Sequence, residues 1–554
     1  MTTPPTRKIT QRTIITSAVA AVLVLIIAFA YVIPQLTKPP TPPTQPAKPK
    51  VLVVGTTDEL WGPDPYDMRG YPAHMLSSLI YDTPVTLEWT KDGWKLKPNL
   101  ATRWETTDKK GQIWEFELRK DVFFHDGTPF NASCVKFSID RVIEGKKGEY
   151  FTVGAYVKSV EVIDNYKIRV NFYDPFSGGP AIMVMSCTAI TSPSAVKRWG
   201  DQYSTKSLAG TGPFKLDSWI PGDQIAIVKN DKYWNKERLP KIDKFIMKFF
   251  KDPSTLKLAL EKKEIDVLHR TPLSSDIPAL QANPGLTVFK GPEPLVREFS
   301  VNPRPQAPAG KYLSNVLVRQ AIAYAIDYER IAKFRDAQRV YGVYHKDQSV
   351  PSVAIDPQKD FKYDPAKAKQ LMTQAGYPNG FAETLEMICC PAYLGAEEVE
   401  MASIIKSNLE AIGIKSAIRT VDFVLFFSLM NTGNTTLAPF SVTTLNPDPD
   451  YFGGVCYHSQ GVMAKRFGFN RTDVDQLVLQ ARAELNVTKR IELYYKIQMI
   501  ADGPDLLRGQ IYLYRPWNYA IAWKYVKGDL TPTLMYRHTI DWTQIDIDPD
   551  RKIS

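Results

Sequence analysis

Residues 114–130 read WEFELRKDVFFHDGTPF and are the most informative stretch of the chain for its fold. Trp114, Phe116 and Leu118 alternate with charged neighbours, which is the period of two expected of a half-buried β-strand. The part that follows, HDGTPF, is rich in turn residues, because Gly127 tolerates a positive φ and proline fixes its own φ. The stretch therefore predicts a strand followed by a tight turn, and we interpret it as scaffold rather than as a site.

The chain around this stretch alternates strand and helix signals without a fixed repeat. Apolar alternation around central turn residues predicts β-hairpins at 160–172 and 214–228. Helical periodicity and capping residues predict helices at 318–334, 365–376, 396–411, 473–484 and 487–501, with a strand at 414–421. The predicted class is mixed α/β, with a β-rich part early and a helix-rich part late.

The N-terminus predicts an extracytoplasmic body. Residues 14–33 contain no charge and are long enough to cross a ~30 Å hydrocarbon core as a helix. Arg7, Lys8 and Arg12 precede them, which places residues 1–13 in the cytoplasm. The Ala-Phe-Ala pattern at residues 28–30 also fits a cleaved signal peptide, and we favour the uncleaved anchor. Residues 34–50 hold seven prolines and predict an extended stalk.

Composition excludes several classes of function. The net charge is +10, but residues 1–50 contribute +6, so 63 basic and 59 acidic residues remain in the body and nothing favours nucleic acid. No nucleotide-binding, metalloprotease or serine-hydrolase motif occurs, and no C-x-x-C or Cys/His spacing favours a metal, so we expect no cofactor and no enzyme. The five cysteines permit one or two disulfides. Paired carboxylates that meet only in the fold leave a secreted hydrolase of oligosaccharides or peptides as an alternative.

Four stretches occur in the order and spacing of a known family. They are residues 98–105 (PNLATRWE), residues 114–130, residues 210–234 beginning GTGPFKL, and residues 318–331 (VRQAIAYAIDYERI). Over residues 51–545 the chain resembles the bacterial extracellular solute-binding proteins of family 5, the dipeptide- and oligopeptide-type binding proteins of ABC importers. The resemblance implies a two-lobe α/β fold of the periplasmic-binding-protein type (type II, cluster C) with an inserted β-rich subdomain. It places lobe I at 51–85, 206–298 and 508–554, the inserted subdomain at 86–205, and lobe II at 299–507.

The resemblance implies a function as well as a fold. A membrane-tethered binding protein would capture an oligosaccharide or oligopeptide between its lobes, close over it, and deliver it to separate ABC permease and ATPase subunits. A surface sensor or chaperone on the same fold is a further alternative.

The family pattern also indicates where a ligand would bind. Residues 445–452 (LNPDPDYF) match a run in which peptide-binding relatives carry an aspartate that pairs with the ligand's ammonium group. Leu445 stands at that aspartate's position, with Asp448 and Asp450 nearby, and a leucine there disfavours a charged peptide terminus. Position along the chain adds six more candidate ligand-binding residues: Tyr71, Arg297, Glu298, Tyr512, Tyr514 and Trp517. The aromatic side chains among them suit sugar rings, so we expect a sugar or another uncharged solute slightly more than a free peptide.

Overall fold

The computed structural model describes residues 2, 22–23, 48–90, 93–108, 110–148, 151–270, 272–345, 349–395, 397–533 and 540–551. Among these residues no helix combines the length and apolar character that a bilayer crossing requires. The expected anchor or signal segment at 14–33, apart from residues 22–23, and the expected stalk as far as residue 47 lie outside the described residues. Residues Lys50–Ser554 form one compact unit, which the following paragraphs describe.

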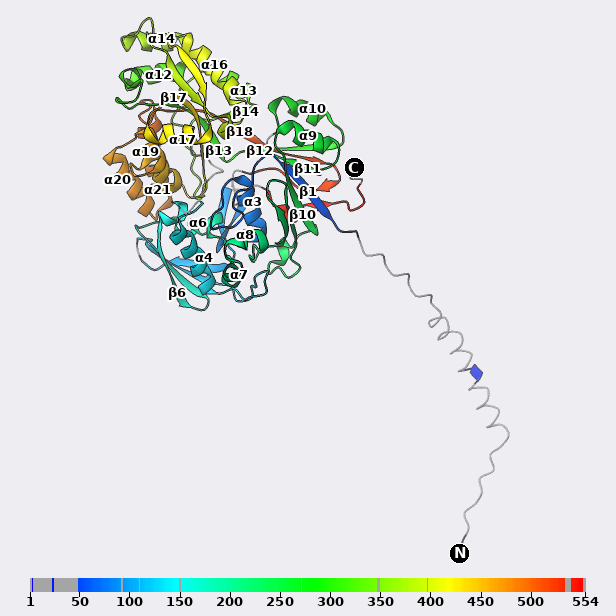
Figure 1. Ribbon diagram of the computed structural model, residues 1–554. Coiled ribbons are helices and arrows are strands. Elements are labelled where there is room, and N and C mark those ends of the chain that lie inside the picture. Colours follow the sequence, from blue (N-terminus) through cyan, green and yellow to red (C-terminus); the bar gives the residue numbers. More distant parts are fainter. Residues whose placement is uncertain are drawn as a thin grey trace. The chain divides into compact units, whose positions relative to one another are not determined.

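A single twelve-stranded sheet runs through this unit and holds two lobes together (Figure 1). In lobe I, β1 (Val51–Thr56) lies between β10 (Lys244–Phe249) and β11 (Val267–His269), and all three are parallel. β9 (Gln224–Lys229) and β8 (Phe214–Ile220) extend the sheet beyond β10. Helices α9 (Pro253–Glu261) and α10 (Ile277–Ala282) contact β1, β11 and β12 (Leu286–Pro292).

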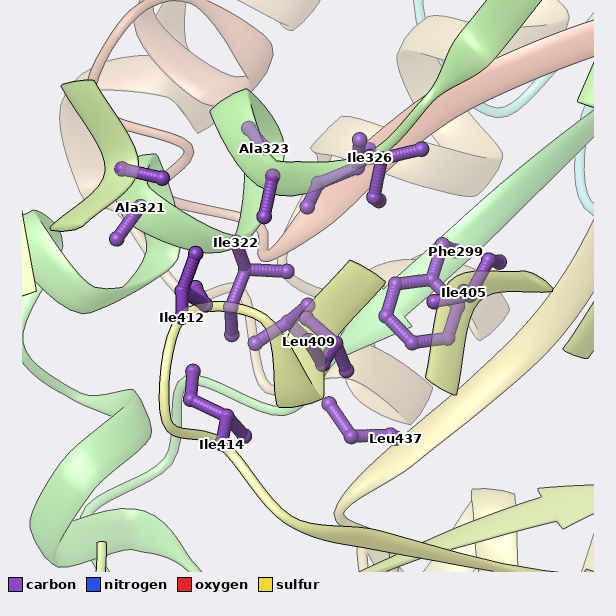
Figure 2. Packing of buried hydrophobic residues seen from close by; sticks show 14 of the residues in the cluster. Phe299, Ala321, Ile322, Ala323, Ile326, Ile405, Leu409, Ile412, Ile414 and Leu437 are labelled. Atoms are coloured by element: carbon purple, nitrogen blue, oxygen red, sulfur yellow. The ribbon is translucent and has the colours of Figure 1, made fainter. Parts of the chain in front are cut away.

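Lobe II carries the other half of the sheet. Its strands are β13 (Leu295–Val301), β14 (Ala337–Arg339), β15 (Leu385–Cys389), β16 (Ser416–Thr420) and β17 (Leu437–Thr443). Around them lie α12 (Val316–Ala325), α13 (Tyr328–Phe334), α14 (Pro365–Gln374), α16 (Glu398–Glu410), α17 (Phe423–Thr432), α19 (Val462–Phe467), α20 (Thr472–Ala483) and α21 (Val487–Asp502). Figure 2 shows the apolar core between α12, α16 and the sheet, where Ile322, Ile405, Leu409 and Phe299 pack in one cluster.

Two chain segments cross between the lobes. β18 (Gln510–Trp523) pairs with β13 of lobe II up to Tyr514 and with β12 of lobe I from Trp517 onward. The other crossing is the short link Glu293–Pro294 between β12 and β13. By strand pairing the chain changes lobes at 293–294 and between 516 and 517, because Pro516 still pairs with β14 of lobe II. The sequence placed these changes at 298/299 and 507/508.

The inserted subdomain has a core of its own. It contains a hairpin of β2 (Val85–Thr90) and β3 (Gly93–Pro98), and a sheet of β4 (Ala101–Thr106), β5 (Ile113–Leu118), β7 (Lys167–Phe172) and β6 (Val157–Asp164). Helix α4 (Ala132–Gly145) packs on β6 and β7. Ala195 of α7 (Pro193–Trp199) and Tyr203 of α8 (Tyr203–Lys206) pack in the lobe I core instead, so the subdomain's own core ends near Ile190.

Local sequence signals predicted most of these elements. The expected hairpins are β6–β7 and β8–β9, and the side chain of Asp364 accepts a hydrogen bond from the backbone N–H of Lys367 at the start of α14. The predicted helix at 318–334 is two helices, because Asp327 caps α13 through the N–H of Arg330 while Ile326 is extended. All five cysteines are free and buried, so the disulfides that the sequence permitted do not form.

Candidate functional site

A cavity of about 600 Å³ lies between the lobes, beside both crossing segments. Its size falls within the range of small-molecule sites, which is roughly 300–1,000 Å³. Residues of lobe I, lobe II and the crossing strands all line it. Its polar and aromatic lining comprises Thr57, Asp58, Lys251, Arg270, Ser274, Glu293, Arg297, Arg335, Asp336, Tyr393, Glu397, Ser441, Thr443, Trp517, Asn518 and Tyr519.

The topology explains why the cavity lies there. Asp58, Lys251 and Arg270 each follow the carboxyl end of one of the parallel strands β1, β10 and β11. In lobe II, Tyr393 follows β15, and Thr443 ends the parallel strand β17. Ligands of open α/β sheets bind outside the carboxyl ends of parallel strands. Here two such edges face one cavity.

A second hollow, of about 1010 Å³, lies elsewhere. Its described lining comes from lobe I and the inserted subdomain, and includes Trp89, Trp94 and Trp234. None of those lining residues belongs to lobe II or to a crossing strand, so closure of the two lobes would not enclose a ligand there.

The lobe I wall is built around a paired arginine. Arg270 forms ion pairs with Asp58 (Nε–Oδ2, 3.1 Å) and Glu293 (Nη2–Oε1, 2.5 Å). Its guanidinium lies over the ring of Tyr71, 3.9 Å from the centroid. Tyr71 Oη in turn hydrogen bonds to Nε2 of His269 (3.1 Å), and burial lowers the pKa of His269 to about 3. This wall therefore fixes the cation of Arg270 between two carboxylates, above a neutral histidine.

The lobe II wall holds two arginines in different states. Arg335 is ion-paired with Glu397. Arg297 donates from Nη2 to the carbonyl oxygen of Leu394 (3.2 Å), and its Nε is buried with no hydrogen-bond partner in the described part of the chain. Behind this wall, burial raises the pKa of Glu398 to about 7, against the opposing effects of the Cys390 N–H and the two arginines.

The crossing strand β18 supplies the third wall. Asn518 is only 2% exposed, and neither its Oδ1 nor its Nδ2 has a hydrogen-bond partner among the described residues. Beside it, Lys290 lies over the ring of Trp517, 4.7 Å from the centroid, and Tyr519 donates a hydrogen bond to Asp336 of lobe II. A buried amide without a partner costs free energy, so Asn518 is a candidate contact for a ligand in the cavity.

Comparisons with known proteins agree with this geometry. The sequence model for bacterial extracellular solute-binding proteins, family 5 (middle region), matches residues 95–464. The chain belongs to this family. The glutathione-binding protein GsiB of Shigella flexneri is 28% identical over 377 residues, which is 67% of this chain and 70% of that protein. GsiB of Escherichia coli K12 is equally similar over 375 residues.

Solved structures of other binding proteins have the same fold. The periplasmic binding protein DppA of Helicobacter pylori, in complex with the peptide STSA, superposes with a TM-score of 0.72 at 26% identity, covering 90% of this chain and 98% of DppA. NikA of Brucella suis, in complex with Fe(III)-EDTA, gives a TM-score of 0.75 at 21% identity, covering 90% of this chain and all of NikA. The predicted two-lobe α/β fold and the predicted family are confirmed.

The structure of this family 5 protein brings only some of the predicted site residues to the cavity. Arg297 and Trp517 line it, and Tyr71 lies directly behind its wall under Arg270. Tyr514 is buried in the lobe II core. Glu298 and Tyr512 do not line the cavity.

Glu298 and Tyr512 belong to a separate buried network in lobe II. Arg508 forms ion pairs with Glu298 (3.3 Å) and Asp502 (2.8 Å), and Tyr512 donates a hydrogen bond to Asp502 (2.5 Å). Burial raises the pKa of Glu298 to about 7, with Arg508 acting in the opposite direction. The alternation of a β-strand accounts for this placement, since adjacent residues such as Arg297 and Glu298 point to opposite faces.

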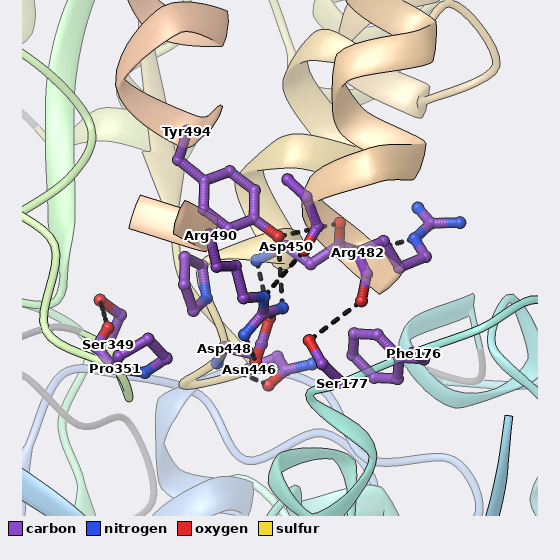
Figure 3. A network of polar contacts seen from close by, with 12 residues as sticks. Phe176, Ser177, Ser349, Pro351, Asn446, Asp448, Asp450, Arg482, Arg490 and Tyr494 are labelled. Atoms are coloured by element: carbon purple, nitrogen blue, oxygen red, sulfur yellow. Dashed lines mark hydrogen bonds and ion pairs between the residues drawn. The ribbon is translucent and has the colours of Figure 1, made fainter. Parts of the chain in front are cut away.

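Asp448 and Asp450 belong to a second buried network of hydrogen bonds and ion pairs (Figure 3). Arg490 donates two hydrogen bonds of 2.6 and 2.8 Å to the carboxylate of Asp448. Arg482 donates one hydrogen bond to the carboxylate of Asp450 (3.0 Å). Ser177 of the inserted subdomain donates to the carbonyl oxygen of Arg482. Both aspartates are thus paired within lobe II, Arg482 links this network to the inserted subdomain, and neither aspartate lines the cavity.

Leu445 has the same structural role. It packs between the core of the inserted subdomain and a core of lobe II, and it does not line the cavity. Its apolar side chain is therefore explained by packing, and it carries no information about the charge of a ligand in this cavity.

Sequence reasoning missed most of the charged lining. Arg270, Arg335, Glu397 and Asn518 were not among the candidates, because they meet only in the folded chain: Arg270 follows β11, Asn518 lies on β18, and Arg335 and Glu397 lie at the ends of α13 and α16. One signal was available: polar residues directly after buried strands, such as Asp58 and Arg270, mark the edge where ligands bind.

Proposed function

We propose that this chain captures a short peptide or peptide-like solute in the interlobe cavity and delivers it, unchanged, to an ABC permease driven by a separate ATPase. The observation that carries the proposal is the composition of the cavity. Both lobes present fixed charges of both signs, and the crossing strand presents a buried amide without a partner. Peptides carry charged termini and main-chain amides, and these groups complement such a lining.

The names of the relatives support the same ligand class. GsiB is a glutathione-binding protein, and the H. pylori DppA structure contains a peptide. The sequence favoured a sugar because of Leu445 and of the aromatic side chains near the second crossing. The first argument loses its premise once Leu445 lies outside the cavity, whereas Trp517 does line it.

A neutral oligosaccharide is the second candidate. Trp517, Tyr519 and Tyr393 line the cavity, and aromatic faces stack on sugar rings. Against it, a neutral sugar brings no counter-charge for Arg297, which forms no ion pair among the described residues, and burial of that charge on closure is costly.

The proposal includes the place of the protein in the cell. Residues 14–33 act as an uncleaved anchor and residues 34–50 as a stalk, so that the compact unit stands outside the cytoplasm beside its permease. The alternative of a secreted hydrolase differs in one respect that is easy to observe, because a hydrolase would cleave the ligand that it binds.

Titration calorimetry of the purified full chain tests the proposal. The probes are the peptide STSA, glutathione and maltotriose, and each is recovered afterwards for mass spectrometry. We expect one peptide-type probe to bind with a stoichiometry of one and to return with its mass unchanged. Binding of maltotriose alone would favour the sugar, and recovery of cleaved peptide would favour the hydrolase.

A further inference from the structure

The cavity contains an arginine whose charge is not balanced by a neighbouring carboxylate. Arg297 lies on β13, opposite Ser441 of β17 and Tyr514 of β18. Arg297 donates a hydrogen bond to the carbonyl oxygen of Leu394, and it forms no ion pair among the described residues. By contrast, Arg270 and Arg335 in the same cavity are each paired with carboxylates.

The buried Nε of Arg297 makes this state costly. A buried donor without an acceptor costs about 1–3 kcal/mol. A carboxylate satisfies Nε and a terminal nitrogen of a guanidinium together, with two parallel hydrogen bonds. The guanidinium of Arg297 can therefore bind a carboxylate, and the described part of the chain does not supply one.

The nearby acid does not fill this role. Glu398 accepts a hydrogen bond from the N–H of Cys390 through Oε1 (3.3 Å), and its Oε2 is buried with no partner in the described ranges. Because burial holds the pKa of Glu398 near 7, a large fraction of this carboxyl is protonated at neutral pH. Its protonation leaves the positive charge of Arg297 available to a ligand.

A second ligand contact lies farther along the crossing strand. Tyr514 is the partner of Arg297 on β18, and Asn518 follows four residues later, opposite Gly291 of β12. Four residues of β-strand correspond to about 13 Å. An extended peptide advances about 3.3–3.6 Å per residue, so three or four residues span this distance.

From these observations, and on the basis of the proposed function, we infer that Arg297 binds the C-terminal carboxylate of the ligand and that Asn518 hydrogen bonds a main-chain amide near the ligand's other end. The site is thereby selective for peptides of three or four residues with a free carboxyl terminus. Arg270, held between Asp58 and Glu293, then faces the amino-terminal part of the ligand with a local excess of one negative charge.

The test changes the ligand and the protein at the same interaction. Calorimetry compares the peptide STSA as the free acid with the same peptide as its C-terminal amide, on the full chain. We expect the free acid to bind about 10- to 100-fold more tightly, as for a hydrogen bond to a charged group. In Arg297→Met this preference should disappear, because the free acid falls to the affinity of the amide.

Controls separate the possible failures. Arg419→Met removes an exposed arginine on β16 that is paired with Glu386, and it should leave the preference unchanged. Arg297→Lys should keep part of the preference for the free acid over the amide. Asn518→Leu should lower the affinity for STSA more than the affinity for the dipeptide Ser-Ala. Equal affinity for acid and amide in the unaltered chain overturns the inference while the proposed function stands, and this comparison needs no variant to fold. If neither form of STSA binds and glutathione does not bind either, the proposed function fails and the inference with it.

Discussion

The ion pair between Asp448 and Arg490 offers a sharp test of the structural account, because the sequence assigned Asp448 to the ligand site. The two side chains are 1% and 4% exposed and meet through two hydrogen bonds of 2.6 and 2.8 Å. Asp448 also accepts a hydrogen bond from the N–H of Asp450 (2.8 Å). The substitution Asp448→Asn keeps the size of the side chain and removes its charge.

The expected cost follows from what remains around Arg490. Without the Asp448 carboxylate, its guanidinium keeps the carbonyl oxygen of Ala481 and the hydroxyl of Tyr494, and both are neutral. Removal of one partner of a buried pair typically costs about 3–5 kcal/mol. Gly178 of the inserted subdomain lies so close that a Cβ there would be 2.2 Å from Asp448 Oδ2, so the new amide has no room to turn away.

The assay is denaturant unfolding followed by tryptophan fluorescence, with peptide binding measured on the same samples. We expect Asp448→Asn to lower the free energy of unfolding by about 3–5 kcal/mol and to leave the affinity for STSA nearly unchanged. The matched control is Glu386→Gln, which breaks the pair with Arg419 whose side chains are 45% and 52% exposed, and it should cost about 0–1 kcal/mol. The reasoning is refuted if Asp448→Asn leaves stability intact and abolishes binding, since Asp448 would then contact the ligand.

Four further predictions concern other parts of the chain. Trp517→Ala should weaken peptide binding by about 1–3 kcal/mol in calorimetry through lost burial and stacking, whereas Trp89→Ala, an exposed tryptophan outside the cavity, should not. Burial raises the pKa of Glu398 from 4.5 to about 7, so between these pH values the folded chain holds a proton that the unfolded chain has released. The free energy of unfolding should therefore fall by about 3 kcal/mol as the pH rises from 4.5 to 7. A pH series of unfolding curves should show this fall in the unaltered chain and not in Glu398→Gln. A reductant should leave the unfolding midpoint unchanged, because the five cysteines are free; a clear drop would indicate a disulfide. Deletion of residues 1–34 should release a folded body into the soluble fraction, since Lys50–Ser554 is compact by itself, and native protein beginning at Tyr31 in the medium would contradict the anchor.

Local signals in the sequence were sufficient for much of the fold. Alternation placed β5 and the two hairpins, and Asp364 with the following proline placed the start of α14. The break between α12 and α13 was missed although Asp327 is a local capping residue. A tertiary contact also supports the break, since the side-chain oxygen of Asn408 accepts a hydrogen bond from the N–H of Asp327.

The site was harder to predict, for a physical reason. Position along the chain identified Arg297 and Trp517, which the cavity contains. The charge of a lone aspartate could not reveal that Arg490, forty-two residues away, neutralises Asp448. Asn518 became a candidate only through its burial without a partner, which is a property of the packed structure and not of the residue.

Native mass spectrometry of a cavity-filled variant tests the central claim most directly, which is that the solute binds between the lobes and leaves unchanged. Ala392 lines the cavity and is exposed, so Ala392→Trp fills the space without disturbing a packed core. Ala366 is equally exposed on α14, away from the cavity, and Ala366→Trp is the matched control. The account predicts one STSA molecule per chain for the unaltered protein and for Ala366→Trp, released with its original mass, and none for Ala392→Trp. Undiminished binding by Ala392→Trp, or release of a cleaved peptide, would contradict it.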